Sequence, residues 1–360
     1  MNTIGDRLRV SIFGQSHAPM IGALIEGLPA GLKLDMDAIS AFMDRRAPGK
    51  SDTATARRET DMPRIISGLN EHGETCGAPL CAVIENGDTR SKDYSKLRDL
   101  PRPGHADFTA FLQSGSAHDI RGGGQFSGRL TAPLCLAGAV CMQLPILKDV
   151  TVGAHLLSVG NVWDEPFSAM GMDESVLKGI AKKPLPTLCD QVGERMREAI
   201  LVAKNENDSI GGIIEAIAMN VPRGLGAPMF SGVENKLAQL MFGIPAVRGV
   251  EFGAGFAAAH MRGSAHNDPF NISDGEIRTL SNNHGGALGG ITTGMPLIVR
   301  AAIKPTPSIG IEQQTVSLNE MTEKPLVIEG RHDPCIAPRA VPVIEAAIWI
   351  ALADLALGAS

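Results

Sequence analysis

The sequence is poor in the residues that mark several specialised protein classes. Only 4% of its 360 residues are aromatic, with a single tyrosine, and its six cysteines form no CxxC pair. Most of these cysteines lie in apolar runs such as APLCLAGAVCM, which is typical of reduced, buried thiols in a cytoplasmic protein. The nine histidines show no HExxH and no zinc-like spacing, so we predict no metal site.

Charge and hydropathy argue against two further classes. The chain carries 33 Lys and Arg against 39 Asp and Glu, a net charge of −6, which disfavours nucleic acid as its main partner. The start, MNTIGDRLRVSIFG, lacks the apolar core and cleavage site of a signal peptide and indicates a strand. The most apolar run, residues 340–359, places Glu345 and Asp354 on roughly opposite faces of a helix. We therefore favour a buried helix, with a subunit interface as one setting for it, over a membrane span.

Three segments of the first half recur in the second half in the same order. Residues 21–32 resemble residues 210–225, and residues 75–91 resemble residues 292–308. A loop containing glycine and arginine then leads into an apolar helix twice. Chance recurrence of Gly-Pro turns is the alternative, but the shared order favours duplication. We predict one domain spanning residues 1–360, with an internally duplicated core and halves at about 1–150 and 205–360.

Apolar periodicity predicts an α+β chain in which strands and helices alternate. Strands are expected at 8–13, 23–26, 80–85, 212–219, 249–252 and 297–303. Helices are expected at 36–46, 132–144, 174–182, 194–205, 234–242 and 342–357. The first helix has Asp35 as its N-cap, and a capping role at its C-terminus is the simplest one for Arg45 and Arg46. Function is expected in the long polar loops between these elements.

The loops concentrate arginine and histidine. Eight loop arginines stand out: Arg45, Arg46, Arg57, Arg58, Arg121, Arg129, Arg331 and Arg339. Guanidinium groups pair bidentately with carboxylate and phosphate, so in an acidic protein this set predicts a pocket for a small polyanion. His17, His105 and His332 lie in Gly/Pro loops, with Asp107 and Asp333 near enough in sequence to orient a histidine or exchange its proton. Each of these residues alone is also compatible with a solvated surface position.

The run RGGGQFSGR, residues 121–129, places three glycines between arginines. Glycine lets an anion approach the backbone closely, but the run matches neither the P-loop nor the dinucleotide motif, and by itself favours an ordinary loop. KPTPS, residues 304–308, suits a phosphate or an unremarkable turn. From the residues alone we predict an enzyme that acts on a phosphorylated or polycarboxylate ligand by acid/base catalysis.

Ten loops together resemble the chorismate synthase family. In the family's order, over about residues 3–354, they are FGQSHAP, RRAPG, RRETD, NGDTRSKDYS, RPGHADFT, RGGGQFSGR, GSAHND, NNHGGALGGITTG, KPTPSI and GRHDPCIAPRAVP. The resemblance implies a β-α-β sandwich and a homotetramer. It implies 1,4-anti elimination of phosphate from 5-enolpyruvylshikimate 3-phosphate to give chorismate, the last step of the shikimate pathway to that product. Reduced FMN is required in the family, and NADPH is a candidate source of the reducing equivalents.

The resemblance also implies roles for individual residues. His17 protonates reduced flavin or its partner, His105 acts near the leaving phosphate, and Asp333 helps flavin N5 to accept the substrate proton. Arg45, Arg46, Arg129 and Arg339 are expected to bind the anionic substrate, and Arg46 also matches a position associated with a nicotinamide nucleotide. The residues expected to bind FMN are Arg46, Gln125, Phe126, Ser127, Pro245, Ala246, Gly289, Lys304, Pro305, Thr306, Pro307, Ser308 and Arg331.

Some residues depart from the family's pattern. Gln15 and Ala18 replace the Glu and the last Gly of FGESHG. Asp52 stands where many members have a basic or polar residue, and its negative charge argues against nucleotide binding at that position. Gln125 and Phe126 stand where RGGGRSS is common, which removes a cation and a hydroxyl from the flavin site. The competing hypotheses are a flavin-dependent oxidoreductase acting on a small anion and a non-catalytic anion- or RNA-binding protein.

Overall fold

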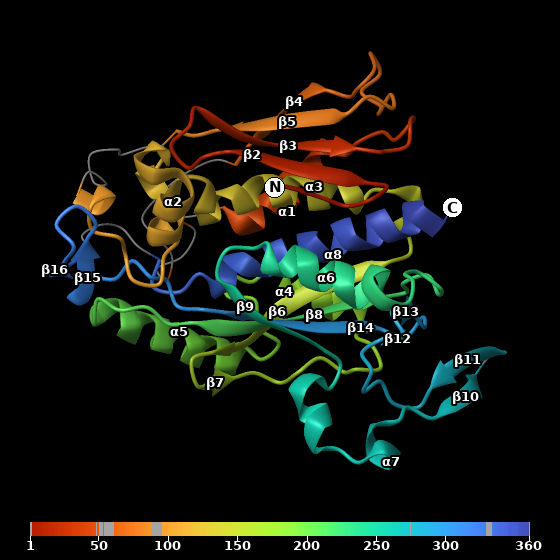
Figure 1. Ribbon diagram of the computed structural model, residues 1–360. Helices are drawn as coiled ribbons and strands as arrows, with labels where there is room; N and C mark the ends of the chain where they lie inside the picture. Colours follow the sequence, from red (N-terminus) through yellow and green to blue (C-terminus); the bar gives the residue numbers. More distant parts are fainter. Residues whose placement is uncertain are drawn as a thin grey trace.

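Two antiparallel five-stranded sheets enclose a layer of helices (Figure 1). The computed structural model describes residues 2–47, 49, 53, 61–87, 96–273, 275–328 and 333–359. The first sheet has the order β1-β2-β3-β5-β4 and the second β7-β6-β8-β14-β9. Their strands are β1 (Thr3–Ile4), β2 (Arg9–Gly14), β3 (Met20–Glu26), β4 (Pro63–Ser67), β5 (Leu80–Glu85), β6 (Thr151–Val159), β7 (Val162–Trp163), β8 (Gly212–Met219), β9 (Val247–Phe252) and β14 (Leu297–Ile303).

The helix layer between the sheets consists of α1 (Met36–Arg46), α3 (Thr131–Cys141), α6 (Val233–Phe242) and α8 (Ala337–Ala359). Helix α8 packs on the other three and on β6 and β8. A side chain at Gly138 of α3 would not fit, because its Cβ would come within 2.5 Å of the backbone of Ala346 in α8. The apolar core is therefore continuous between the two sheets and contains residues of both halves of the chain.

The remaining elements lie outside this sandwich or at its ends. Helices α4 (Glu174–Ile180) and α5 (Asp190–Asn205) pack on the second sheet, whereas α2 (Asp107–Ser114) and α7 (Gly263–His266) lie in long connections. Three two-stranded ribbons are formed by β10 (Phe270–Ser273) with β11 (Glu276–Thr279), β12 (Ala287–Leu288) with β13 (Ile291–Thr292), and β15 (Gln313–Ser317) with β16 (Thr322–Leu326). Short 3-10 helices occupy Lys96–Arg98, Gly115–Ala117, Arg121–Phe126, Gly128–Leu130, Pro145–Leu147, Met229–Ser231 and Gly255–His260.

The two halves share one succession of elements. The order β2-β3-α1-β4-β5-α3 in the first half is matched by β6-β8-α6-β9-β14-α8 in the second, and each set forms the same sheet order. The segments that resemble each other in sequence fall on β3 and β8 and on β5 and β14, which are the neighbouring strands in each sheet. The duplicated core is confirmed at the level of topology. The boundaries of the halves at about 1–150 and 205–360 stay a prediction.

Several predicted elements match the structure in both bounds, namely α1, β5, β8 and β14. The last helix begins at Ala337, so Pro342 lies inside it instead of at its start and removes one helical hydrogen bond there. Helix α8 is long and apolar enough to cross a membrane, but 94% of its most apolar window is buried within the chain, as expected of a core helix. Strand β6 and helix α2 were not predicted.

Candidate active site

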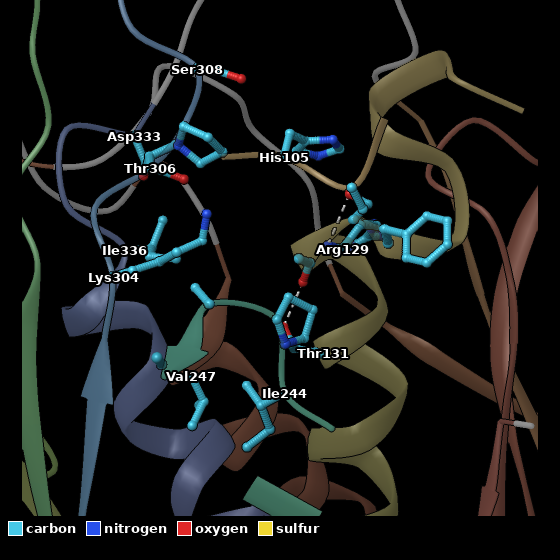
Figure 2. A pocket seen from close by; sticks show the side chains of 18 of the residues that line it. His105, Arg129, Thr131, Ile244, Val247, Lys304, Thr306, Ser308, Asp333 and Ile336 are labelled. Atoms are coloured by element: carbon cyan, nitrogen blue, oxygen red, sulfur yellow. Dashed lines mark hydrogen bonds between the residues drawn. The ribbon is translucent and has the colours of Figure 1, made fainter. Parts of the chain in front are cut away.

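A cavity of about 670 Å³ lies where the N-terminal ends of α3 and α8 approach the C-terminal end of α1. Arg129 and Thr131 line it beside α3, Ile336 and Arg339 at α8, and Arg46 at α1. The loop before β9 and the loop after β14 complete the wall. In Figure 2, Lys304, Thr306 and Asp333 stand on one side, Arg129 and Thr131 on the other, with Ile244 and Val247 below. Two helix N-termini beside one cavity favour a negatively charged ligand.

Arg46 and Arg129 are held in the wall by one buried carboxylate. Arg46 Nη1 donates to Asp61 Oδ2 at 2.5 Å, and Arg129 Nη1 donates to the other oxygen, Oδ1. Burial alone would raise the pKa of Asp61, but the positive charges of Arg46 and Arg129 outweigh it and hold that pKa below its usual range. One negative charge thus positions two positive ones in the wall.

Arg46 and Arg129 also make bonds to neutral groups that fix their planes. Arg46 Nε donates to Thr131 Oγ1 at 3.1 Å, and Arg129 Nε donates to Asn86 Oδ1 at 3.0 Å. On the α8 side, Arg339 Nη1 donates to Asp333 Oδ2 at 2.6 Å, and Arg339 Nε donates to the backbone carbonyl of Arg46 at 3.3 Å. The three guanidinium groups therefore belong to one connected wall.

The three glycines of residues 122–124 pass between two histidines. All three have φ between 55° and 84°, the left-handed region in which glycine is favoured. A Cβ at Gly122 would come within 2.5 Å of the His17 ring, and one at Gly123 within 3.2 Å of His105 Nε2. Gly124 accepts a backbone hydrogen bond from Ser16 at 3.1 Å. The run therefore brings the His17 and His105 segments together.

His105 lines the cavity in a network with Arg102 and Asp107. His105 Nδ1 lies 2.6 Å from Asp107 Oδ1, and Arg102 donates to the same carboxylate through Nε at 2.7 Å and Nη2 at 2.8 Å. Arg102 Nη1 also donates to Ser308 Oγ at 3.2 Å. Burial alone would raise the pKa of Asp107. The hydrogen bonds from Arg102 and His105 outweigh this effect and hold that pKa far below its ordinary range. Asp107 is therefore ionised at neutral pH.

The loop after β14 presents cationic and hydroxyl groups to the cavity. Lys304 Nζ donates to the carbonyl of Gly104, while burial and the nearby charge of Arg248 lower the pKa of Lys304. Thr306 lines the cavity and its Oγ1 is buried with no hydrogen-bond partner among the described residues. An unsatisfied buried hydroxyl beside two cations fits the phosphate group of a bound ligand.

Comparisons with known proteins decide the family. A family profile described as chorismate synthase matches residues 8–357. The chain belongs to the chorismate synthase family. It is 46% identical to a protein named chorismate synthase from Korarchaeum cryptofilum, over 97% of this chain and 96% of that one, and 45% identical to one from Thermococcus kodakarensis, over 97% and 96%. A solved structure titled "Crystal Structure of Chorismate Synthase" matches with a TM-score of 0.77 and 29% identity, over 98% of this chain and 92% of that chain.

Most residues that the family resemblance singled out surround the cavity. Those that line it are Arg46, His105, Gln125, Phe126, Ser127, Arg129, Pro245, Ala246, Lys304, Thr306, Pro307, Ser308, Asp333 and Arg339. His17 lies behind Gly122, which does line it, and Pro305 does not contribute. Ala246 has φ 75°, which marks the loop before β9 as a constrained turn. The ligands and roles predicted for these residues stay predictions.

Three predicted arginine or glycine positions lie elsewhere. Arg45 makes a bidentate pair with Glu345 of α8, at 2.5 and 2.7 Å, and stacks over Phe42, so it ties α1 to α8 and does not line this cavity. Arg121 pairs with Asp119 at 2.8 Å on an exposed surface. Gly289 lies in the turn between β12 and β13, away from the cavity wall.

Some expected residues lie outside the described part of the chain, and some residues of the site were not predicted. The former are Asp52, Arg57, Arg58, Arg331 and His332. Arg102 and Arg248, which line the cavity, and Asp61, which lies behind its wall, were missed because their roles arise from tertiary contacts, although Arg102 opens the motif RPGHADFT and Asp61 ends RRETD. Within the described ranges, no group of three or more His, Cys, Asp or Glu is placed to hold a metal ion.

Proposed function

We propose that the chain eliminates phosphate from 5-enolpyruvylshikimate 3-phosphate to give chorismate, with reduced FMN as its cofactor. The observation that carries this proposal is the charge of the cavity. Among the described residues, Lys304 and five arginines line it, namely Arg46, Arg102, Arg129, Arg248 and Arg339, against one lining carboxylate, Asp333. Asp61 and Asp107 behind the wall offset part of this excess. The two carboxylates and the phosphate of the substrate, together with the phosphate of FMN, are the anions that these cations would pair with.

The cavity also fits a flavin mononucleotide. The unsatisfied Thr306 hydroxyl, with Lys304 and Arg248 beside it, suits the phosphate, and Ile244, Pro245 and Val247 give an apolar surface for the ring. Phe126 adds an aromatic ring to the lining, and Ser127 a hydroxyl. Reduced FMN, when bound, supplies an electron-rich ring that assists loss of the phosphate.

The side chains at the cavity have separate roles in the proposed reaction. Arg46, Arg129 and Arg339 bind and orient the substrate's anionic groups. His105 delivers a proton to the leaving phosphate, and His17, held against Gly122, controls protonation on the flavin side. Asp333, whose Oδ2 pairs with Arg339, takes part in the transfer of the substrate C6 proton. The glycine run keeps both histidines at fixed positions.

An anaerobic assay tests the proposal. The purified chain is incubated with the enolpyruvyl substrate and dithionite-reduced FMN, and the formation of phosphate and chorismate is followed. Absence of both products would contradict the proposed elimination. Product formation that consumes one reduced flavin per turnover would support the oxidoreductase alternative instead. A parallel reaction with oxidised FMN and NADPH shows whether the chain reduces its own flavin, since product there requires flavin reduction.

We also propose a cytoplasmic homotetramer. The family resemblance supports the tetramer, and the six cysteines without a disulfide, three of them buried, support the cytoplasm. Light scattering after size-exclusion chromatography should give four times the chain mass of 37.9 kDa. A monomeric mass at micromolar concentration contradicts the tetramer without affecting the proposed reaction.

A further inference from the structure

The two nitrogens of the His105 ring have different surroundings. Nδ1 lies 2.6 Å from Asp107 Oδ1, within a network whose other members are largely buried. Nε2 lies at the Gly123 end of the ring, where an added Cβ would come within 3.2 Å. The ring itself lines the cavity. Among the described residues, Nε2 is therefore the nitrogen of this ring that has no carboxylate contact.

Distances decide which nitrogen carries the proton when the ring is neutral. Arg102 Nη2 lies within hydrogen-bond distance of both ring nitrogens, 3.1 Å from Nδ1 and 3.3 Å from Nε2, so this contact favours neither tautomer strongly. The contact with Asp107 is shorter, and an ionised carboxylate can only accept. Nδ1 must then be the donor to Asp107, which leaves Nε2 unprotonated in the neutral ring and a donor in the charged ring.

Arg102 holds Asp107 in place for this contact. Its guanidinium group donates hydrogen bonds to both carboxylate oxygens of Asp107, and its backbone N–H donates to Oδ2 at 3.1 Å. The third link, from Nη1 to Ser308 Oγ, connects the network to the loop after β14. Arg102, Asp107 and Ser308 are each 5–6% exposed, so water does not compete strongly for these bonds.

We propose that Asp107, held by Arg102, is a positioning residue that fixes the Nδ1–H tautomer of His105 and presents Nε2 to the substrate. Its catalytic consequence rests on the proposed function, because it assumes that His105 exchanges a proton with the leaving group. The position of the proton on the ring does not rest on it. The alternative is a purely structural role, in which Asp107 only stabilises the conformation of residues 102–107 at the start of α2.

The tautomer is measured directly by long-range ¹H–¹⁵N correlation spectra of protein labelled in histidine, with the signals assigned through His105→Gln. The experiment needs neither flavin nor substrate. We expect the neutral ring of the unsubstituted chain to carry its proton on Nδ1, and Asp107→Asn to move a large share of it to Nε2, because an amide can donate to Nδ1. A proton on Nε2 in the unsubstituted chain overturns the proposal, even if the variant fails to fold.

Kinetics of Asp107→Asn test the consequence. We expect kcat to fall about 100-fold with KM changed by less than about threefold, since the substrate contacts remain and only the proton donor is misplaced. Asp164→Asn is the matched control: Asp164 is also buried beside a histidine, His155, but away from the cavity, and its removal should lower the melting temperature without lowering kcat.

Three results contradict the positioning role. They are a kcat that falls equally in both variants, an Asp107→Asn variant whose tautomer changes without loss of kcat, and one that loses kcat with the tautomer unchanged. If the unsubstituted chain makes no chorismate at all, the proposed function fails, while the tautomer still decides whether Asp107 sets the proton on His105.

Discussion

Two histidine–carboxylate clusters in this chain have similar parts and different surroundings. His105 lines the cavity with one nitrogen committed to Asp107. His155 is fully buried on the second sheet, where Nε2 lies 3.2 Å from Glu215 and Nδ1 3.5 Å from Asp164, under the ring of Phe167. His155 has a carboxylate near each nitrogen and does not line the cavity, whereas His105 does line it.

The charges of the second cluster are satisfied within the protein. His155, Glu215, Arg300 and Glu251 stand directly opposite one another across β6, β8, β14 and β9. Glu215 accepts from Arg300 at 2.8 Å and from the backbone of Phe167 at 2.6 Å. Among the described residues, the cavity is lined by more cations than carboxylates. The two clusters therefore differ in their access to a ligand, not in residue type.

The largest expected difference is between the effects of substituting His105 and of substituting His155. His105→Ala should lower kcat by roughly 10²- to 10⁴-fold with little change in melting temperature, because it removes an acid but no core packing. His155→Ala should instead cost about 3–5 kcal/mol of stability, because Asp164 and Glu215 lose a buried partner. Steady-state kinetics and thermal unfolding of both variants check this; equal losses of activity and stability in each would return His105 to a structural role. His17→Ala and Asp333→Asn should follow His105→Ala.

Asp61→Asn should affect both properties, since this residue is buried in the core side of the wall and orients Arg46 and Arg129. We expect a loss of about 3–5 kcal/mol in unfolding free energy and a raised KM. Glu276→Gln, which breaks the exposed pair with Arg223, is the control and should cost at most about 1 kcal/mol. A KM unchanged in a destabilised Asp61→Asn protein contradicts the link between the carboxylate and the substrate site.

The glycine run gives a test of geometry inside the wall. Gly122→Ala has to adopt φ 60° and would place its Cβ against His17 and Ser16, at a cost of about 1–3 kcal/mol or a displaced His17. Gly179→Ala, in α4 and not among the residues that line the cavity, meets nothing within 4 Å and should be nearly neutral. Activities of the two variants check this, and equal activities would show that the position of His17 is unimportant.

Stability should depend on pH through the buried cluster. Burial would lower the pKa of His155, but the hydrogen bonds to Asp164 and Glu215 raise it above its usual value. The stabilisation is therefore fully present below the ordinary histidine pKa of about 6.5 and is lost as pH rises through the higher folded-state value. We expect the melting temperature to fall over that alkaline range, and the slope to disappear in His155→Gln. A slope that survives the substitution assigns the dependence to other groups.

The smallest effect concerns the departure from the family's flavin loop. Phe126 lines the cavity with 37% of its surface exposed, so Phe126→Ser removes apolar contact available to a ring. We expect reduced FMN to bind about 2- to 10-fold more weakly, consistent with an aromatic contact of about 0.5–1.5 kcal/mol. Anaerobic titration measures it, with Phe230→Ser, an exposed residue away from the cavity, as control. Tighter binding in Phe126→Ser would show that the phenyl ring obstructs the flavin.

Sequence patterns predicted the fold's regular elements better than its site. Strands β8 and β14 are apolar runs bounded by Gly and Pro, and the Asp35 cap and apolar stripe define α1. Strand β6 was missed because Gly153 and His155 interrupt its apolar run, and their burial depends on α4 and β8. Arg45 and Arg46 show the same limit: successive residues on a helix point about 100° apart, so one reaches Glu345 and the other Asp61.

The redox balance of a single anaerobic turnover tests the central claim most directly. Reduced FMN, the chain and the enolpyruvyl substrate are mixed, and phosphate, chorismate and the flavin absorbance are followed together. We predict one phosphate for each chorismate, with the flavin still fully reduced at the end. Loss of one reduced flavin for each product, or no phosphate release from an intact substrate, would contradict the proposed reaction.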